Sequence, residues 1–394
     1  MSTSSATSHP VDAVISCVAA TSTVVITDGR TVAEKSTLYP KISKLSDFLY
    51  MCKKIAPEAR IIPIVGTVKL HGAHVDWVIS RDNSIRVQSR NMLKLAVGND
   101  NYGFAAFSQP IRDVILRLKE NLIRRYVQLN PDLTVDPDHP VIISGEWCGQ
   151  GVQKGVAVSQ LPRHFVIISI RINDTWVSET DYADIHDEVS GIYHIGKAGS
   201  YQLDLDTQDI DPSEAAIQAI VTDVEKACSY GLTRNAMGRG EGLVWKARDH
   251  MDNPKMWFKY KGDSTAVSHK WKNVKDSERV QGSKTAGAAD DREGEYKFAA
   301  LAVTERRLEQ GLEYLAETGT ARKCGMGKFL GWVTNDIFVE EKREMIEMNI
   351  GPGRLKPAIR SIAKAWYERK LMEDMEEGKD ELGTVAEKLK NIAV

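Results

Sequence analysis

The chain has 394 residues, of which 42% are hydrophobic and 27% are charged, and its 52 Lys and Arg against 54 Asp and Glu leave a formal net charge of −2. This composition is typical of a globular protein with two or three domains and excludes a collagen-like or wholly disordered chain. No stretch approaches the roughly 18 consecutive apolar residues of a membrane span, and a net charge near zero argues at first against a nucleic-acid partner.

The first 35 residues read as an N-terminal extension to which the sequence assigns no role. Its opening residues, MSTSSATSHP, have neither the apolar core of a secretory signal nor the arginines of a mitochondrial presequence, so we expect a cytoplasmic or nuclear location. Further on, the run from Val11 to Ile26 followed by Asp28-Gly29 is typical of one or two strands that end in a turn. Five scattered cysteines without a Cys-x-x-Cys pair favour a reducing compartment.

Short β-rich runs punctuated by Gly, Asn and Asp follow, and they predict antiparallel strands. These runs are Ile61 to Val68, Val75 to Ser80, Ser84 to Gln88, Val141 to Ser144, Phe165 to Ile170 and Gly242 to Lys246. Between the third and fourth runs, a helix is expected to begin at Pro110, because apolar residues recur at helical spacing from Ile111 to Tyr126.

The later part of the chain is expected to be mainly helical. One helix is predicted from Pro212 to Tyr230, ended by Gly231. Three more are predicted between Gly-rich breaks, at Glu295 to Glu317, Asp336 to Asn349 and Pro357 to Glu377, with the breaks at Gly325-Met326-Gly327 and Gly351-Pro352-Gly353. We therefore expect an extension over 1–35, an antiparallel-sheet domain over 36–270, a linker over 271–294 and a smaller helical domain over 295–394. This is an α+β organisation.

The segment with the clearest chemistry closes the first β-rich run, as Val68-Lys69-Leu70-His71-Gly72-Ala73-His74. A lysine is a nucleophile when it is deprotonated, and a glycine three residues later lets the backbone pass close to a ligand. Alone, the pattern more often marks a surface lysine before a turn. The pair His71-x-x-His74 also lacks the third ligand that a zinc site needs.

Further segments follow this lysine in a fixed order. They are Gln88 to Asn91, Ser144 to Lys154 (SGEWCGQGVQK), Gly240 to Lys246 (GEGLVWK) and Trp257 to Lys261 (WFKYK). The series resembles motifs I, Ia, III, IV and V of the covalent nucleotidyltransferase superfamily of ATP-dependent ligases and capping enzymes. His71, where DNA ligases and capping enzymes usually carry Asp, indicates the RNA ligase 2 family, as does the stretch from Gly327 to Ile337 (GKFLGWVTNDI). The resemblance covers about Tyr39 to Met345.

The resemblance implies an antiparallel-sheet nucleotidyltransferase domain with an ATP-grasp-like fold, followed by a helical C-terminal domain. It also implies an ATP-dependent RNA ligase that uses Mg²⁺ or Mn²⁺. Lys69 would attack the α-phosphorus of ATP to form lysyl-AMP, the AMP would pass to an RNA 5′-phosphate, and a 3′-hydroxyl would displace it. Lys259 and Lys261 would neutralise charge on the α-phosphate, because residues two apart on a strand share a face.

The other implied contacts to ATP or AMP are His71, Arg90, Glu146, Ile168, Glu241 and Lys246. Glu146 would accept a hydrogen bond from a ribose hydroxyl, Arg90 would contact phosphate or ribose, and Glu241 would hold the divalent cation. Lys246 would contact the same phosphate region. Two positions depart from the family pattern: His74 stands where the phage enzyme has asparagine, and Ile168 stands where the family stacks an aromatic residue on adenine.

The resemblance further implies RNA with 3′-hydroxyl and 5′-phosphate ends, as a nicked duplex, as the partner of a monomeric ligase that does not bind membranes. Two alternatives stay open, a ligase for nicked DNA or RNA/DNA hybrids and a catalytically inactive nucleic-acid-binding relative. Charge is strongly segregated, because residues 171–225 contain 2 basic and 13 acidic residues whereas residues 239–284 contain 11 basic and 6 acidic residues. The low net charge is thus a cancellation, and we expect salt-sensitive binding on one face.

Overall fold

The computed structural model describes residues 24–27, 30–33, 37–90, 92–100, 102–261 and 288–392. The chain forms two units, residues 1–39 and residues 40–394. In the first, β1 (Val24–Thr27) and β2 (Arg30–Ala33) pair as an antiparallel hairpin. Most of the predicted extension and residues 271–287 of the predicted linker lie outside the described residues, whereas residues 288–294 of that linker form the start of a helix. The rest of the fold belongs to the second unit.

A four-stranded antiparallel sheet carries the lysine that ends the first β-rich run. Its strands, in the order β10-β3-β11-β12, are β10 (Tyr201–Asp206), β3 (Ile61–Lys69), β11 (Gly242–Ala247) and β12 (Trp257–Tyr260). Alternate side chains point to opposite faces. One face packs against α1 (Leu45–Ile55) and α4 (Ile210–Lys226) in an apolar core. The opposite face presents Lys69, Val244 and Lys259 to a cavity.

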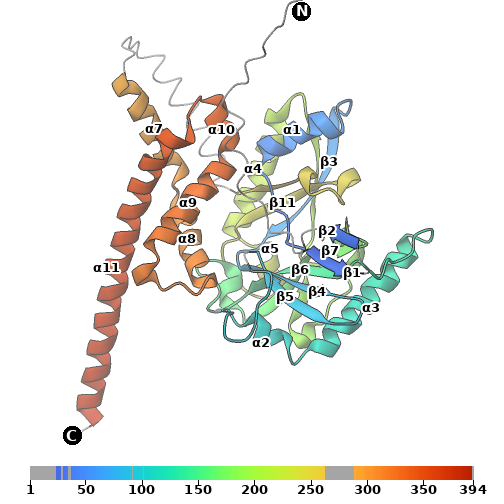
Figure 1. The fold of residues 1–394 in the computed structure, drawn as a ribbon, viewed down its shortest axis with the longest axis horizontal. Coiled ribbons are helices and arrows are strands. Elements are labelled where there is room, and N and C mark those ends of the chain that lie inside the picture. Colours follow the sequence, from blue (N-terminus) through green and yellow to red (C-terminus); the bar gives the residue numbers. More distant parts are fainter. Residues whose placement is uncertain are drawn as a thin grey trace, which may run out of the picture. The chain divides into compact units, whose positions relative to one another are not determined.

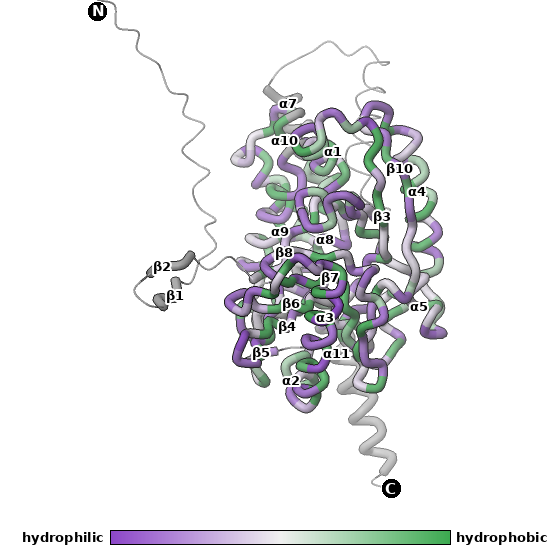
Figure 2. Tube along the Cα trace, turned by 90° about the vertical axis from the view of Figure 1, so that its right-hand side faces the viewer, coloured by the Kyte–Doolittle hydropathy of each residue, from purple (hydrophilic) through white to green (hydrophobic). Residues whose placement is uncertain are grey.

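A second sheet of six strands lies beside the first in the chain's larger unit. Its strands are β4 (Ala73–Ile79), β5 (Ile85–Ser89), β6 (Val141–Cys148), β7 (His164–Ile172), β8 (Thr175–Val177) and β9 (Ile192–His194). The order is β5-β4-β6-β7-β8, and β9 pairs with β7 as the parallel neighbour. Residues of β6 and β7 are buried along nearly their whole length and form a hydrophobic part of the body in Figure 2.

Two helices and a group of aromatic rings cover one face of this second sheet. The helices are α2 (Phe104–Ser108) and α3 (Arg112–Leu129), and their apolar side chains join those of the strands in one core. The rings of Trp77 and Phe165 lie 4.3 Å apart between centroids. A Cβ atom on Gly145 would lie 2.3 Å from the Phe165 ring, so the glycine in β6 is required by this packing. Because alternate side chains of a strand point to opposite faces, the polar side chains of His74 and Glu146 lie on the other face of the sheet.

Within the described residues 288–392, five α-helices form the C-terminal part, and they are grouped together in Figure 1. They are α7 (Ala288–Ala302), α8 (Glu305–Glu317), α9 (Met326–Glu340), α10 (Lys342–Glu347) and α11 (Pro352–Ile392). Their shared core includes Phe298, Leu312, Phe329 and Trp366. The rings of Phe329 and Trp366 stack with centroids 6.0 Å apart, which ties α9 to α11. None of the helices within the described ranges is long and apolar enough to cross a membrane.

The predicted α+β class, with antiparallel sheets and a helical C-terminal region, is confirmed, and so are all six β-rich runs and the helix after Pro110. The helix predicted to end at Gly231 instead ends at Lys226, and Gly231 lies inside the short helix α5 (Ser229–Thr233). A Cβ there would lie 2.6 Å from the Cβ of Ala157, so this glycine serves close packing and not helix termination. The strands β8, β9 and β10 were not predicted.

Helix boundaries in the C-terminal region also differ from the prediction. The Thr304 hydroxyl accepts a hydrogen bond from the Arg307 N–H at 3.3 Å, and this N-cap divides the helix expected over Glu295 to Glu317. Met326 and Gly327 begin α9 and do not break the chain, because Gly325 already stands before the first turn. The proline in the second predicted break, Pro352, begins α11, the position in a helix where proline is best tolerated.

A buried ion pair joins the two sheets. Lys246 Nζ on β11 donates to Glu179 Oε2 at 2.7 Å and to Ser169 Oγ on β7 at 3.1 Å, and it lies 4.1 Å from the Trp257 ring centroid. The side chains of Lys246 and Glu179 are only 3% and 2% exposed. Ser169 faces Lys246 because β7 contains a bulge, in which Ile168 has no partner on β6. Lys246 thus serves to hold the sheets together here and does not line the cavity.

Replacing Lys246 with methionine should lower the free energy of unfolding by about 3–5 kcal/mol, because Glu179 would be left as an unpaired buried charge. The double variant Lys246→Met, Glu179→Leu should recover most of this loss, since an apolar pair of similar volume needs no charge compensation. Urea unfolding of the three proteins measures both effects. The exposed pair Lys226–Asp223 supplies the control, and Lys226→Met should cost under about 1 kcal/mol. A Lys246→Met variant as stable as the wild type would contradict the assignment.

Candidate active site

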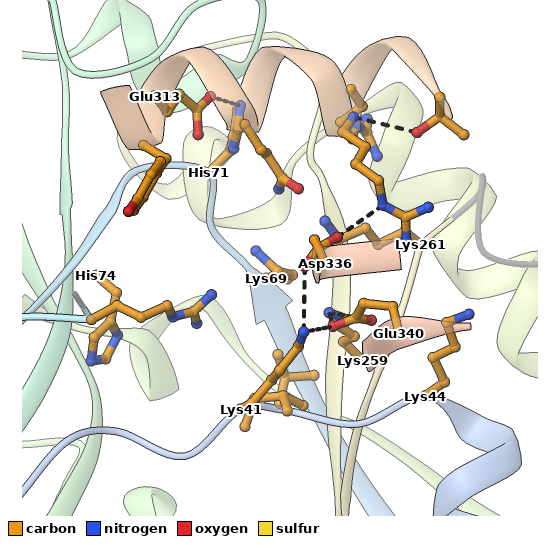
Figure 3. Close-up of a pocket in the computed structure, with 18 of the residues that line it drawn as sticks. Lys41, Lys44, Lys69, His71, His74, Lys259, Lys261, Glu313, Asp336 and Glu340 are labelled. Atoms are coloured by element: carbon orange, nitrogen blue, oxygen red, sulfur yellow. Dashed lines mark hydrogen bonds and ion pairs between the residues drawn. The ribbon is translucent and has the colours of Figure 1, made fainter. Parts of the chain in front are cut away.

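A cavity of about 250 Å³ lies between the lysine-bearing face of the first sheet and the helices α8 and α9, as Figure 3 shows. Most of the side chains predicted from the sequence surround it. Those that line it are Lys69, His71, Arg90, Glu146, Lys259 and Lys261. Glu241 contacts two of these lysines from behind, whereas Ile168 and Lys246 are not among the lining residues. The structure therefore brings together seven of the nine positions.

Lys69 is held at the end of β3 by the way the first sheet packs. It lies opposite Gly242 of β11, where φ is 143° and a Cβ would come within 2.3 Å of the Tyr260 carbonyl oxygen. Only glycine permits this close approach of β11 and β12. Lys69 Nζ donates to Glu241 Oε2 at 2.5 Å and to the Leu70 carbonyl at 3.3 Å. The amine is thus fixed at the cavity wall.

Glu241 is the carboxylate that the cationic groups of the site share. Its side chain is 1% exposed, its Oε1 is paired with Lys261, and its Oε2 lies 3.7 Å from His71 Nδ1. Burial alone would raise the pKa of Glu241, but Lys261, Lys69 and His71 together hold it well below the usual value. Burial also lowers the pKa of Lys261 to about 8, against the opposing effect of Glu241. Two lysines therefore face one carboxylate, which leaves an excess of positive charge.

The turn after Lys69 is fitted closely to β6. The Gly72 N–H donates to Glu146 Oε1 at 2.9 Å, and a Cβ on Gly72 would lie 2.4 Å from the Trp147 carbonyl oxygen. The glycine of the lysine motif is therefore required for this contact. Burial lowers the pKa of His71 to about 4, so its imidazole is neutral at pH 7.

His74, a predicted departure from the motif pattern, belongs to a buried polar group on the inner face of the second sheet. It lies directly opposite Glu146 in the β4–β6 pairing. Its Nε2 is 2.9 Å from Asp76 Oδ1, and Gln88 Nε2 donates to Asp76 Oδ2 at 2.8 Å. The Asp76 carboxylate thus fixes the imidazole ring of His74 at the cavity wall.

Two further lysines, Lys41 and Lys44, line the cavity together with Lys259, and neither was predicted from the sequence. The segment that carries them runs beside β12, because the Lys259 N–H donates to the Ser43 carbonyl at 2.8 Å and Ser43 Oγ donates to the Trp257 carbonyl at 2.7 Å. Lys41 and Lys44 both line the cavity. No local motif marks them, since only the tertiary contact with β12 brings them to the site.

The end of α9 and the residue after it supply acidic partners of these lysines. Glu340 lies 3.0 Å from Lys259 Nζ and 2.8 Å from Lys41 Nζ, and Glu341 is paired with Lys44. Burial lowers the pKa of Lys259, although Glu340 opposes the shift. The acidic side chains of α9 were also missed, because their sequence pattern is that of an ordinary amphipathic helix.

Two aromatic rings from the C-terminal helices complete the wall. Tyr314 and Trp332 both line the cavity, and their rings stack with centroids 6.1 Å apart and an interplanar angle of 24°. The predicted adenine contact, Ile168, packs at the edge of the first core instead. In this arrangement the aromatic surface of the cavity therefore comes from α8 and α9 and not from β7.

Within the described residues, no group of three or more His, Cys, Asp and Glu side chains is arranged to hold a metal ion. Both oxygens of Glu241, the one predicted metal ligand, are paired with lysines. A divalent cation at Glu241 would require these lysines to turn away, and its other ligands would have to come from the oxygens of a bound substrate. This donor set does not fit a resident metal centre, so the metal role of Glu241 stays a prediction.

Comparison with known proteins is consistent with this site. The family model for RNA ligase matches residues 62–261, just over half of the chain, whereas comparison with curated proteins gives no match. Among solved structures, the chain is similar to Naegleria gruberi RNA ligase. A mutant of that enzyme with AMP and Mn is 18% identical over 59% of this chain and 57% of that chain, with a TM-score of 0.36. The same enzyme with PPi is 17% identical over 58% and 57%, with a TM-score of 0.35.

These structural matches span less than two thirds of the Naegleria enzyme. The family match covers β3 to β12, from the strand that ends at Lys69 to Lys261 at the cavity. The chain therefore belongs to the RNA ligase family.

Proposed function

We propose that this protein is an ATP-dependent RNA ligase that joins a 3′-hydroxyl to a 5′-phosphate across a nick in duplex RNA, through lysyl-AMP. The observation that carries the proposal is the placement of Lys69 at a cavity wall beside two further lysines and one buried carboxylate. An excess of positive charge in a partly closed site suits a substrate with several phosphates. Naegleria RNA ligase has been solved with ATP and Mn, which supports the choice of nucleotide.

In the first step, Lys69 Nζ forms a bond to the α-phosphorus of ATP. The bond from that phosphorus to the oxygen that bridges to the β-phosphorus breaks, and pyrophosphate leaves with the electron pair. The lysine attacks through its nitrogen lone pair, so the bond to phosphorus forms with loss of the ammonium proton. The departing pyrophosphate is a base that can take up the proton.

Lys259 and Lys261 stabilise the charge that develops in this step. Both line the cavity within reach of the Lys69 region, and both are now paired with carboxylates, Glu340 and Glu241 respectively. Phosphate oxygens are equivalent acceptors for an ammonium group, so the lysines can exchange these partners for the substrate. A divalent cation would arrive with the ATP phosphates and neutralise part of their charge.

The remaining contacts hold the nucleoside. Arg90 and Glu146 line the same cavity as Lys69, which suits contacts to phosphate and ribose. Neutral His71 can donate one hydrogen bond and accept another without adding charge beside the phosphates. Ile168 does not line the cavity, so a contact between Ile168 and the adenine base requires the base to bind outside the volume that the cavity now occupies.

The last two steps reuse the same groups. An oxygen of the RNA 5′-phosphate attacks the α-phosphorus of lysyl-AMP, the phosphorus–nitrogen bond breaks, and Lys69 regains its proton. The 3′-hydroxyl of the second strand then attacks the activated 5′-phosphorus, and AMP leaves with the electrons of the broken bond. Covalent catalysis is suited to this reaction because an RNA 5′-phosphate has no good leaving group of its own.

Incubation of the protein with ATP labelled at the α-phosphate and with magnesium should give a covalent protein–AMP adduct. Lys69→Ala should lower the amount of adduct by about 10³-fold or more, because no other amine takes the place of the nucleophile. Lys255→Ala removes an exposed lysine just before β12 and should leave adduct formation unchanged. Denaturing gels record the label. A wild-type protein that never becomes labelled would exclude the proposed function.

Sealing of nicked duplexes tests the proposed ends. A nick with an RNA 3′-hydroxyl and a 5′-phosphate should be sealed, whereas a 5′-hydroxyl end should not, because it offers no phosphate oxygen to accept AMP. Lys69→Ala should still seal a strand supplied with a pre-adenylylated 5′ end, since that step bypasses lysyl-AMP. Product length on a sequencing gel is the measurement. Equal sealing of DNA and RNA 3′-hydroxyl strands would favour a DNA or hybrid nick ligase instead.

A further inference from the structure

Three lysines of the cavity find their acidic partners where α9 ends and α10 begins. Lys41 and Lys44 come from the segment before α1, and Lys259 comes from β12. Lys41 Nζ lies 3.3 Å from Asp336 and 2.8 Å from Glu340, as Figure 3 shows. Lys44 is paired with Glu341, the residue after α9, and lies 3.5 Å from Glu344 of α10. Positive groups from two separate parts of the chain thus meet the acidic groups at the junction of α9 and α10.

Glu340 occupies the centre of this arrangement. Its side chain is 7% exposed and lies between two ammonium groups, at 2.8 Å from Lys41 Nζ and 3.0 Å from Lys259 Nζ. Burial would raise the pKa of Glu340, but Lys259 and Lys41 hold it below the usual value, so the group is a carboxylate. A buried anion shared by two lysines has the same geometry that a bound phosphate oxygen would have.

The lysines are anchored independently of α9. The backbone and side chain of Ser43 form hydrogen bonds with β12. These bonds keep Lys41 and Lys44 beside Lys259 and do not involve the C-terminal helices. Arg307 of α8 forms ion pairs with Asp336 and Glu341, each at 2.9 Å. These two carboxylates would therefore stay paired with a cation after the helices move away from the lysines. Separation would therefore leave three lysines together without acidic partners from α9.

The helices α8 and α9 line the cavity of about 250 Å³ together with the three lysines. Carboxylate and phosphate oxygens are equivalent acceptors for an ammonium group, so both cannot occupy the same place beside these lysines. Binding of phosphates there therefore requires the carboxylates to withdraw, which breaks the contacts between the three lysines and the C-terminal helices.

We propose that Lys41, Lys44 and Lys259 form the binding site for the pyrophosphate end of ATP, and that Glu340, with Asp336 and Glu341, occupies this site as an internal anion until the nucleotide displaces it. The identity of the nucleotide rests on the proposed function, whereas binding of pyrophosphate itself does not. Helix α9 then acts as a competitive cover of the site. The apparent affinity for the phosphates is reduced by the fraction of molecules in which the cover is closed.

Titration calorimetry of the full-length protein with inorganic pyrophosphate tests this proposal. Glu340→Gln keeps the size of the side chain but removes its charge, so it should tighten pyrophosphate binding by about 3–10-fold as the closed fraction falls. Adding Lys41→Ala to Glu340→Gln should then weaken binding by about 10-fold, because one charge-assisted contact to phosphate is lost. Lys41→Ala is tested in the Glu340→Gln protein because, in the wild type, loss of Lys41 would also remove its ion pairs with Asp336 and Glu340. These ion pairs hold α9 over the site.

Glu309→Gln is the matched control. Glu309 is an exposed glutamate on α8 that does not line the cavity, and its loss should leave pyrophosphate binding unchanged. Weaker or equal binding by Glu340→Gln overturns the proposal, as does a double variant that binds as tightly as Glu340→Gln. A wild-type protein that fails to form an adduct with ATP while the calorimetric pattern holds would exclude the proposed function and leave this site intact.

Discussion

Glu241 is the group on which the arrangement of the cavity depends. A carboxylate that is 1% exposed is stable only beside cations, and here they are Lys69 and Lys261, one on each oxygen. This requirement fixes the end of β3 against the start of β11 and the residue that follows β12. Lys69, the proposed nucleophile, is therefore positioned by the same ion cluster that closes the first sheet. A change at Glu241 would be expected to alter the fold and the chemistry together, which makes it a poor position for separating the two.

The site contains more lysines than its fixed carboxylate can neutralise. Lys69 and Lys261 share Glu241, whereas Lys41, Lys44 and Lys259 are paired with acidic side chains at the end of α9 and in the residues that follow it. Lysines held close together repel each other unless an anion lies between them. The anion can be a carboxylate of the protein or a phosphate of the substrate. The carboxylates of the C-terminal helices and the phosphates of a substrate are therefore alternative anions for the same lysines. Through this competition the C-terminal helices can affect the proposed chemistry without contacting the reacting atoms.

The sequence predicted those parts of the site that are set by local pattern. Lys259 on β12 and Lys261 just after it, which were expected to share a face, both line the cavity, and so do Lys69 and Gly72 of the Lys-x-x-Gly turn after β3. Long-range contacts could not be predicted in the same way. Lys41 reaches the cavity because Ser43 bonds to β12, more than 200 residues later in the chain. The bulge in β7, which leaves Ile168 without a partner on β6, has the same origin, since a bulge depends on the partner strand.

Lys246 illustrates how one strand can serve both stability and function. Val244 and Lys246 lie two residues apart on β11 and share the face opposite the first core, yet Val244 lines the cavity and Lys246 is sealed between the sheets. The cost of burying Lys246 is offset by Glu179, Ser169 and the ring of Trp257, none of which lines the cavity. Because this pair is satisfied within the fold, it does not compete for the phosphates as the lysines near α9 do. Thus the positive charge available to a substrate is decided by which lysines have fixed partners, and not by how many lysines the motifs contain.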